Sequence, residues 1–365
     1  MRPRLVMVAV VAGLVALAAC QPVKKTPPGG PTLEIDTTFV TGLSNPWDIA
    51  FVPGDAGTMF FTQRDGPISV KRGAAPPTQL LANPSGSAPA GEGGVMGIAV
   101  HPDFATNRFV YVCYTHADDN RVVRFLVDDG FTTLGSPTDI VTGIPKNVFH
   151  DGCRIRFGPD GQLWITTGDA GMGTNPQNLS SLGGKVLRVN PADGTPAPGN
   201  PALGGDPRVY TYGHRNPQGI AFRANGEVYT TEHGPDRDDE VNLLVAGANY
   251  GWNPVPGYNQ GVPMTAAGAT PAVWSSGSPT IAPSGATFVT GPQWESWNDA
   301  LVVAVLKTQR LQVFPERGGT LDFANPTVVP MGVRLRSAVQ GPDGSLYLAT
   351  DVGAGGGAIW RVVPR

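Results

Sequence analysis

Short apolar runs alternate with polar turns along most of this chain, and the runs recur in pairs. Each pair has an apolar strand, a turn with Pro, Asp or Gly, and a second strand rich in aromatic residues, as in "CRIRFGPDGQLWITTGD" and "QGIAFRANGEVYTTEHG". The Asp-Gly and Asn-Gly steps in such turns are typical of hairpins that join antiparallel strands. After the first twenty residues, no window of a dozen residues has the i, i+3, i+4, i+7 spacing of an amphipathic helix. The pattern therefore predicts an all-β chain.

The paired strands recur six times. Equivalent positions fall at Val52, Val100, Phe157, Phe222, Phe288 and Val339, so the steps between them are 48, 57, 65, 66 and 51 residues. Six units at this spacing predict a six-bladed β-propeller, with a β-sandwich or a two-domain arrangement as the alternative. To close the ring, we expect residues 32–40 and 357–363 to share the last blade. The two longest steps place the largest insertions near residues 165–215 and 240–285, and binding and catalytic residues often lie on such loops.

The N-terminal segment differs from the rest in its composition. Arg2 and Arg4 precede an apolar run over residues 5–19, which is short for a membrane span and predicts a signal peptide over residues 1–19. The run ends in "LVALAAC", which resembles a bacterial lipobox and would make Cys20 the lipidated first residue of the mature protein. An ordinary cleaved signal is the alternative. We expect an exported protein, held at the outer face of the cell membrane only through a lipid on Cys20.

The remaining composition agrees with this organisation. The chain has 49 Gly and 36 Pro among 365 residues, as many turns require. Residues 20–32 are polar and rich in Pro and Gly, which predicts a flexible tether before a propeller domain over residues 33–365. Without residues 1–19 the chain keeps 24 of its 26 basic residues against 29 acids, a net charge of −5, and no basic cluster that would favour a nucleic-acid partner. Cys113 and Cys153 can form a disulfide or remain buried thiols, and both possibilities are open.

Several polar residues stand directly before the repeated strands. In a propeller these loops converge at one end of the central channel, so we expect a cluster of Glu92, His150, Arg215, Asn216, Thr280, Arg334 and Arg336 near the axis. Lys307, at a strand end, can add a further cation. So many cations predict a polyanionic ligand held through its carboxylates or phosphates. The alternative for each arginine is a hydrogen bond to loop carbonyls.

Two further features indicate chemistry at the same end. His150 at the mouth of the channel can be a base, a metal ligand or a satisfied polar residue. Five acids follow within nine residues, at Glu232, Asp236, Asp238, Asp239 and Glu240. This run lacks the spacing of an EF-hand. Gly234 and Pro235 can instead turn backbone carbonyls toward a hard cation such as calcium, and a solvated acidic turn is the alternative.

The sequence also resembles a known protein family. The segments "HPDF", "GDAG", "GGKVLRVN", "YGHRNPQG", "EHGPDRDDEVN" and "GANYGW" occur in the order and spacing of the soluble PQQ-dependent sugar dehydrogenases, and are most similar to the aldose sugar dehydrogenase branch. The resemblance extends over about residues 40–362. Each segment alone is a weak signal, whereas together they are specific.

The resemblance implies a pyrroloquinoline quinone (PQQ) and a calcium ion on top of the propeller. The residues that match PQQ contacts are Arg215, Asn216, Thr280, Lys307, Arg334 and Arg336. His150 matches the base that removes the proton of the sugar C1 hydroxyl while a hydride passes to C5 of the quinone. Arg215 would stabilise the charge that develops on the quinone, and the carbonyls of Gly234 and Pro235 would bind the calcium.

Other positions follow the family less closely. Glu240 and the carbonyl of Tyr250 match a second, variable calcium site, and Asp239 would be either a supporting acid or the acid that orients the base. Glu92 and His233 stand where the glucose enzymes have Gln, and Phe149 replaces an acid. These departures favour a broad range of aldoses over glucose alone, with Glu92, His150 and Asp239 on the substrate side.

The expected reaction therefore oxidises an aldose at C1 to a lactone and passes electrons to an external acceptor. The loops that contribute to dimer contacts in the glucose enzymes are shorter in this sequence, which favours a monomer or a weak dimer. Two other functions remain open from the sequence: a calcium-dependent propeller lactonase or esterase, and a lipoprotein that binds an anion without catalysis.

Overall fold

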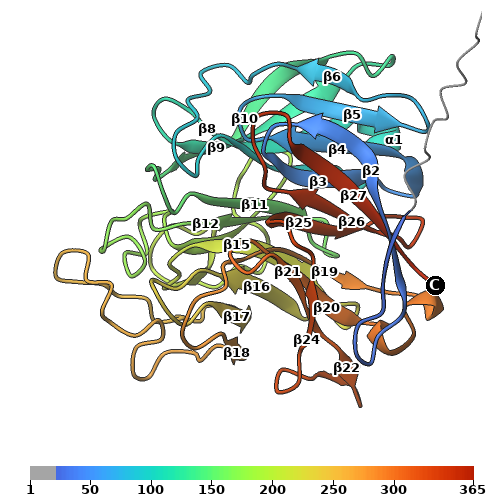
Figure 1. Cartoon of the computed structure of the whole chain (residues 1–365). Helices are drawn as coiled ribbons and strands as arrows, with labels where there is room; N and C mark the ends of the chain where they lie inside the picture. The colour runs from blue at the N-terminus through green and yellow to red at the C-terminus, as the bar shows by residue number, and fades with distance from the viewer. Residues whose placement is uncertain (1–21) are drawn as a thin grey trace, which may run out of the picture.

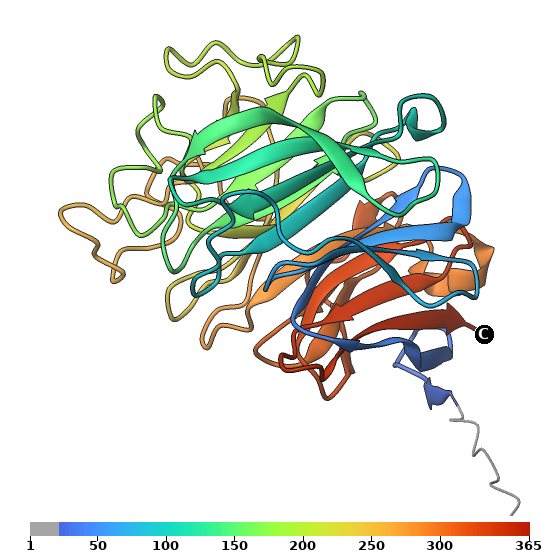
Figure 2. The same cartoon turned by 90° about the horizontal axis from the view of Figure 1, so that it is seen from above.

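The computed structural model describes residues 22–365, which fold into six antiparallel sheets arranged around one centre (Figures 1 and 2). The expected signal peptide, residues 1–19, and Cys20 lie outside the described residues. The first sheet has the order β3 (Pro46–Val52), β4 (Asp55–Gln63), β5 (Ile68–Arg72), β6 (Thr78–Leu81). The second has the order β7 (Val95–Val100), β8 (Phe109–Thr115), β9 (Asn120–Val127), β10 (Leu134–Ile144). The third has the order β11 (Gly152–Phe157), β12 (Leu163–Thr167), β13 (Lys185–Val189), β14 (Val209–Tyr212).

The other three sheets repeat the same order. The fourth comprises β15 (Pro217–Phe222), β16 (Val228–Glu232), β17 (Glu240–Leu243), β18 (Trp274–Ser275). The fifth comprises β19 (Pro283–Val289), β20 (Ala300–Val305), β21 (Arg310–Phe314), β24 (Thr327–Pro330), beside a small hairpin of β22 (Glu316–Arg317) and β23 (Thr320–Leu321). The sixth comprises β25 (Leu335–Gln340), β26 (Leu346–Thr350), β27 (Gly357–Pro364), β2 (Leu33–Leu43), β1 (Val23–Lys25). Helical structure in the described chain is limited to α1 (Phe104–Asn107) and the 3₁₀ turn η1 (Pro292–Trp297).

The sheets form a closed ring, because the innermost strand of each sheet contacts that of the next, and β25 contacts β3. All six positions that mark the sequence repeat are the last or last-but-one residues of these innermost strands. The six-bladed β-propeller predicted from the repeat is therefore confirmed. The expected closure is also confirmed, because Ile35 of β2 pairs with Val362 of β27.

The start of the domain differs from a free tether. Val23–Lys25 forms β1, which pairs with Leu33–Ile35 of β2. A Cβ atom at Gly30 would lie 2.4 Å from the Trp297 ring, so this glycine permits a close approach of the chain to η1. Part of the segment expected as a tether is thus packed on the last two blades. Within the described part of the chain, no helix has the length and apolar character needed to cross a membrane.

Cys113 of β8 and Cys153 of β11 are joined in a disulfide, with 5.7 Å between their Cα atoms. Both residues are fully buried. The choice between a disulfide and two thiols is therefore decided by the fold, which places the second and third blades against one another here.

A buried ion-pair network fills the channel between the innermost strands. Asp48 of β3 accepts hydrogen bonds from Arg156 of β11 at 2.7 and 2.8 Å, and its Oδ1 lies 2.6 Å from Arg154. The Ile98 N–H of β7 and the Ser337 hydroxyl of β25 also donate to this carboxylate. One carboxylate thus joins four blades. Although burial opposes ionisation, the two guanidinium groups hold the pKa of Asp48 below its usual value.

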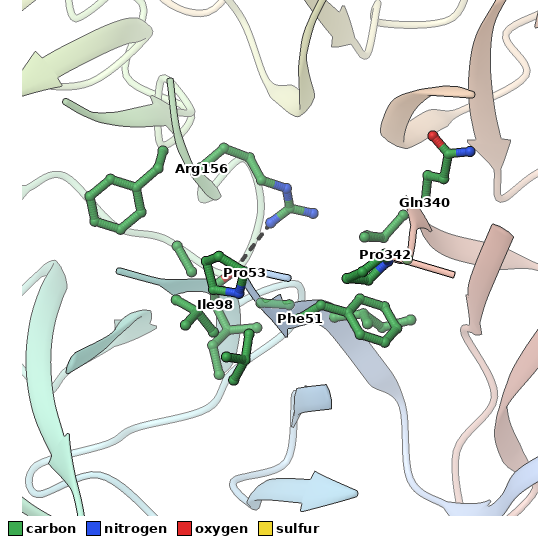
Figure 3. A pocket seen from close by; sticks show the side chains of 14 residues that line it. Phe51, Pro53, Ile98, Arg156, Gln340 and Pro342 are labelled. Carbon is green, nitrogen blue, oxygen red and sulfur yellow. Dashed lines mark hydrogen bonds between the residues drawn. The ribbon is translucent and has the colours of Figure 1, made fainter. Parts of the chain in front are cut away.

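The two ends of the channel differ. The innermost strands all run in the same direction, so the loops before them gather at one end and their last residues at the other. At the latter end, Phe51, Ile98, Arg156 and Gln340 line a cavity of about 330 Å³ (Figure 3). The residues singled out in the sequence lie at the opposite end.

Candidate active site

The loops before the innermost strands bring most of the predicted residues together. The backbone N–H of His150 donates to Glu92 Oε2 at 3.0 Å, and Asn216 Nδ2 approaches the same oxygen at 3.4 Å. Asn216 Oδ1 in turn accepts from the N–H of Gly152 and from Gln218. His150 has a φ of 62°, so the turn before β11 holds it in the left-handed region.

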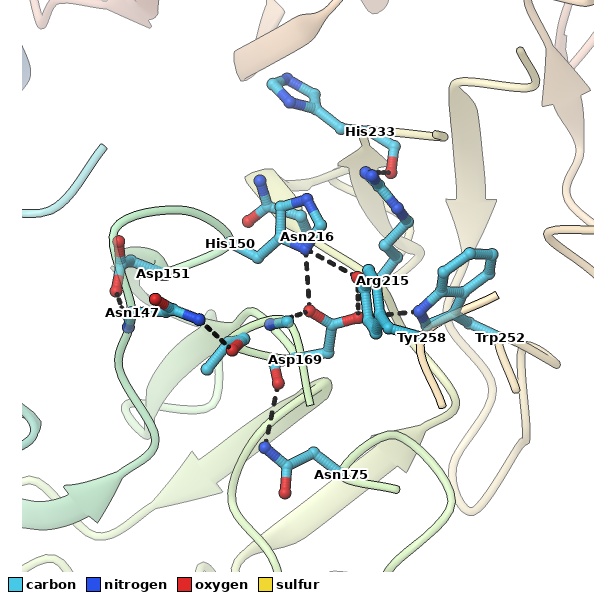
Figure 4. A network of polar contacts seen from close by, with 12 residues as sticks. Asn147, His150, Asp151, Asp169, Asn175, Arg215, Asn216, His233, Trp252 and Tyr258 are labelled. Atoms are coloured by element: carbon cyan, nitrogen blue, oxygen red, sulfur yellow. Dashed lines mark hydrogen bonds and ion pairs between the residues drawn. The ribbon is translucent and has the colours of Figure 1, made fainter. Parts of the chain in front are cut away.

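The His150 side chain is oriented by an acid that the sequence analysis did not assign. Its Nδ1 lies 2.8 Å from Oδ1 of Asp169, which follows β12 and is fully buried (Figure 4). Asp169 also accepts from the Trp252 indole at 2.8 Å, the Tyr258 hydroxyl at 2.6 Å and the Gly171 N–H at 2.8 Å. Because Nδ1 faces a carboxylate, it carries the ring proton of neutral His150, and Nε2 keeps its lone pair as a base.

The alternative that Asp239 orients His150 is therefore wrong. Asp239 accepts the backbone N–H groups of Gly234 at 2.8 Å, Ile281 at 2.5 Å and Ala282 at 2.7 Å. Asp239 thus joins the turn at Gly234 to the residues just before β19 and holds the two segments together. Asp169 lies in the "GDAG" segment, one of the motifs that carry the family resemblance, so this motif could have indicated the acid that orients His150.

Arg215 has two kinds of partners. One guanidinium nitrogen donates to the carbonyls of His233 at 3.0 Å and Gly234 at 2.9 Å, and the other donates to Gln260 at 3.0 Å. Its guanidinium carbon also lies 5.5 Å from the centre of the Trp252 ring. The alternative raised for propeller arginines, hydrogen bonds to loop carbonyls, thus holds for part of this side chain. Its buried Nε has no hydrogen-bond partner within the described residues.

Arg334 and Arg336 share an acid, Asp351, that the sequence analysis did not assign to them. Arg334 donates to Asp351 Oδ2 at 3.0 Å and Arg336 donates to the same atom at 3.2 Å. Arg336 also donates to Gln218, whereas its buried Nε has no partner in the described part of the chain. Burial lowers the pKa of Arg336, and Asp351 and Glu92 oppose this effect.

Lys307 and Thr280 form a pair on the next loops around the ring. Lys307 Nζ donates to the Thr280 hydroxyl at 2.8 Å, and the Thr280 N–H approaches the Asp236 carbonyl at 3.4 Å. Lys307 is exposed, so its ammonium group is accessible from the open end of the channel.

Glu92 and His233, which are neighbours in the cleft, differ in their charge at neutral pH. Although burial would raise it, His233, the His150 N–H and Arg336 hold the pKa of Glu92 below its usual value. Burial lowers the pKa of His233, whose Nε2 lies 2.8 Å from the Pro283 carbonyl. At neutral pH the cleft therefore has an ionised Glu92 beside a neutral His233.

The predicted metal ligands lie on the loop before β17, at the first residue of β17, and on the loop after it. The Gly234 carbonyl faces Arg215, and Gly234 is held by Asp239 before the partly exposed turn of residues 235–238. A calcium at Gly234 and Pro235 would depend on backbone oxygens, because residues 22–365 contain no group of three or more His, Cys, Asp or Glu set to hold a metal. Glu240 is buried near Glu232, and burial and this neighbour raise its pKa to about 8. Such a pair of carboxylates is the charge that a cation near Tyr250 would neutralise.

Comparison with known proteins agrees with this arrangement. Residues 43–361 match the Glucose / Sorbosone dehydrogenase family. The chain belongs to this family. Among sugar dehydrogenases of known name, it is 28% identical to the aldose sugar dehydrogenase YliI of Escherichia coli over 346 residues, covering 88% of this chain and 91% of the other. It is 29% identical to quinoprotein glucose dehydrogenase B of Acinetobacter calcoaceticus over 356 residues, covering 72% and 73%.

A solved structure extends the similarity to three dimensions. The PQQ-bound form of aldose sugar dehydrogenase from Streptomyces coelicolor superimposes with a TM-score of 0.80 at 35% identity, covering 93% of this chain and 100% of the other. The predicted resemblance to soluble PQQ-dependent sugar dehydrogenases is therefore confirmed.

Proposed function

We propose that this protein is a PQQ- and calcium-dependent dehydrogenase that oxidises aldoses at C1 to lactones. The observation that carries the proposal is the His150–Asp169 pair, which leaves an imidazole base at the end of the channel where Arg215, Arg334, Arg336 and Lys307 gather. A base beside several cations suits the removal of a proton next to a polyanionic cofactor.

The residues present fit PQQ, which carries three carboxylates. Arg215 and Arg336 each keep a buried Nε without a partner among the described residues, and such donors are costly unless a ligand satisfies them. Lys307 and Arg334 are exposed toward solvent and can meet further carboxylates. Thr280 and Asn216 supply polar contacts, and the Gly234 and Pro235 carbonyls would hold calcium.

The chain's own residues would act on the sugar. His150 Nε2 would take the proton of the C1 hydroxyl while Asp169 stabilises the imidazolium through Nδ1–H. PQQ with its calcium, when bound, would accept the hydride from C1. Arg215 would stabilise the negative charge that develops at the cofactor, and Glu92 can accept hydrogen bonds from sugar hydroxyls.

The two alternative functions leave parts of this site unused. A calcium-dependent lactonase or esterase would need acids and amides from several blades around one ion, and gives the cationic cluster no role. A binding protein without catalysis would use the cations but not the His150–Asp169 pair. The dehydrogenase accounts for both.

The decisive experiment reconstitutes purified protein with PQQ and calcium and follows dye reduction by a panel of aldoses. We expect aldose-dependent reduction and a cofactor spectrum. Arg215→Ala should lower kcat about 10²- to 10³-fold, because a donor at the developing charge is lost. His150→Ala should abolish turnover yet keep PQQ affinity. A reconstituted protein that oxidises no aldose, or an Arg215→Ala variant with full turnover and PQQ affinity, would contradict the proposal.

We further propose that the protein is exported, is anchored through a lipid on Cys20, acts as a monomer or weak dimer, and passes electrons to an external acceptor. The apolar leader before Cys20 and the Cys113–Cys153 disulfide support export, since disulfides persist in oxidising compartments. Cys20→Ala should release the protein from the membrane fraction.

A further inference from the structure

A segment of the loop between β17 and β18 lies against the catalytic residues. Residues 253–262, here called the strap, are mostly exposed, but Tyr258 within them is half-buried. The strap approaches the Asp169 loop closely, because a Cβ atom at Gly173 would lie 2.3 Å from the Gly257 carbonyl oxygen. The strap therefore rests on the loop that carries the orienting acid.

Tyr258 contacts both members of the catalytic pair. Its hydroxyl lies 2.6 Å from Asp169 Oδ2 and 2.9 Å from His150 Nδ1, and Figure 4 shows the three groups converging. Burial and the nearby Asp169 raise the pKa of Tyr258, so its hydroxyl keeps its proton at physiological pH. That single proton belongs to the shorter contact, with Asp169.

This arrangement has a consequence for the tautomer of His150. Because the Tyr258 O–H donates its hydrogen bond to Asp169, the phenol oxygen presents only lone pairs to His150 Nδ1. A His150 ring with its proton on Nε2 would place the bare Nδ1 against Asp169 and these lone pairs, which is unfavourable. The Nδ1–H tautomer places a donor there instead and leaves Nε2 free to act as a base.

We propose that Tyr258 is a positioning residue that fixes the tautomer and ring orientation of His150 through Asp169. The expected effect on kcat rests on the proposed function, whereas the expected effect on the His150 tautomer does not. The same strap also holds Arg215, since Gln260 Oε1 accepts from its guanidinium at 3.0 Å. The loop thus positions the base with one side chain and the cation with another.

The test compares Tyr258→Phe, which removes only the hydroxyl, with the parent protein. Nitrogen-15 NMR of the histidine rings, recorded without cofactor, should show His150 as the Nδ1–H tautomer in the parent and a mixture in the variant. In the PQQ- and calcium-loaded enzyme, kcat should fall about 10- to 100-fold, the size of loss seen when an outer hydrogen-bond partner of a metal-bound histidine is removed. The KM should stay within about threefold, since the hydroxyl acts through His150 and not on bound sugar.

Tyr229→Phe is the matched control. The Tyr229 hydroxyl also donates to a carboxylate, Glu227 at 3.0 Å, but at the end of the fourth blade away from the site. The Tyr229→Phe variant should leave both the His150 spectrum and kcat unchanged. A Tyr258→Phe spectrum identical to that of the parent would overturn the proposal, as would a kcat within twofold of the parent. If the parent itself oxidises no aldose, the proposed function fails, while the spectra still decide the role of Tyr258.

Discussion

At the scale of single residues, Asp151 has an unusual environment next to His150. It is 1% exposed, and its Oδ1 accepts from Asn120 at 2.8 Å and from the Asn147 N–H at 3.3 Å. Its Oδ2 is buried without a partner in the described structure. Burial raises its pKa to about 6, so its charge is costly in the folded state at neutral pH.

The sign of the pH dependence follows from this shift. Because the folded pKa lies above the ordinary value of 3.8, this group contributes stability that is fully present below pH 3.8. That contribution is lost as the pH rises through about 6. Over these roughly two pH units, the free energy of unfolding should fall by at most about 3 kcal/mol because of Asp151.

Asp151→Asn should therefore stabilise the protein at pH 7, by about 1–3 kcal/mol, and have a smaller effect near pH 4. Urea unfolding at both pH values measures the difference. Asp129→Asn, at a fully exposed side chain, is the control and should change stability little at either pH. An equal effect of Asp151→Asn at both pH values would show that its charge is not costly.

At the scale of elements, the disulfide between β8 and β11 joins neighbouring blades across 40 residues of sequence. A cross-link of this loop length restricts the unfolded chain and stabilises the fold by about 3–4 kcal/mol in the chain-entropy account. Both cysteines are fully buried, so the bond is shielded from reductants in the folded protein.

Replacing Cys113 and Cys153 together by Ala should lower the free energy of unfolding by about 3 kcal/mol without changing the histidine NMR spectra. Denaturant titration measures the loss. Mass spectrometry of the unreduced digest should show the two cysteine peptides joined. Separate peptides with free thiols would disprove the bond.

At the scale of the whole molecule, Asp48 links four blades through the buried channel network. Removing one member of a buried ion pair leaves the other charge uncompensated, which typically costs about 3–5 kcal/mol. Arg154 is fully buried and its guanidinium also stacks 4.0 Å from the centre of the Trp47 ring, so it cannot turn to solvent.

Asp48→Asn should therefore destabilise the entire ring by about 3 kcal/mol or more, and the unfolding transition should remain a single step. Glu34→Gln is the control, because Glu34 pairs with the exposed Arg365 at 2.9 Å and surface pairs contribute at most about 1 kcal/mol. Comparable losses in the two variants would show that the channel network has no special role in stability.

The fold and much of the site could be predicted because their signals are local or repeated. The six repeats of strand, turn and strand determined the propeller, since each blade needs the same apolar alternation to bury its faces. Loops before equivalent strands must meet at one end of the ring, so the repeat alone predicts that Glu92, His150 and Asn216 lie together, and they do.

Tertiary structure alone decided the pairings between side chains that are distant along the chain. Asp169 rather than Asp239 orients His150, Asp351 pairs with two arginines, and Tyr258 reaches the catalytic pair from a long insertion. Cys113 and Cys153 are joined because adjacent blades place them in contact. Hydrophobic periodicity determines which residues form strands, whereas a hydrogen bond depends on ångström distances that only the packed ring defines.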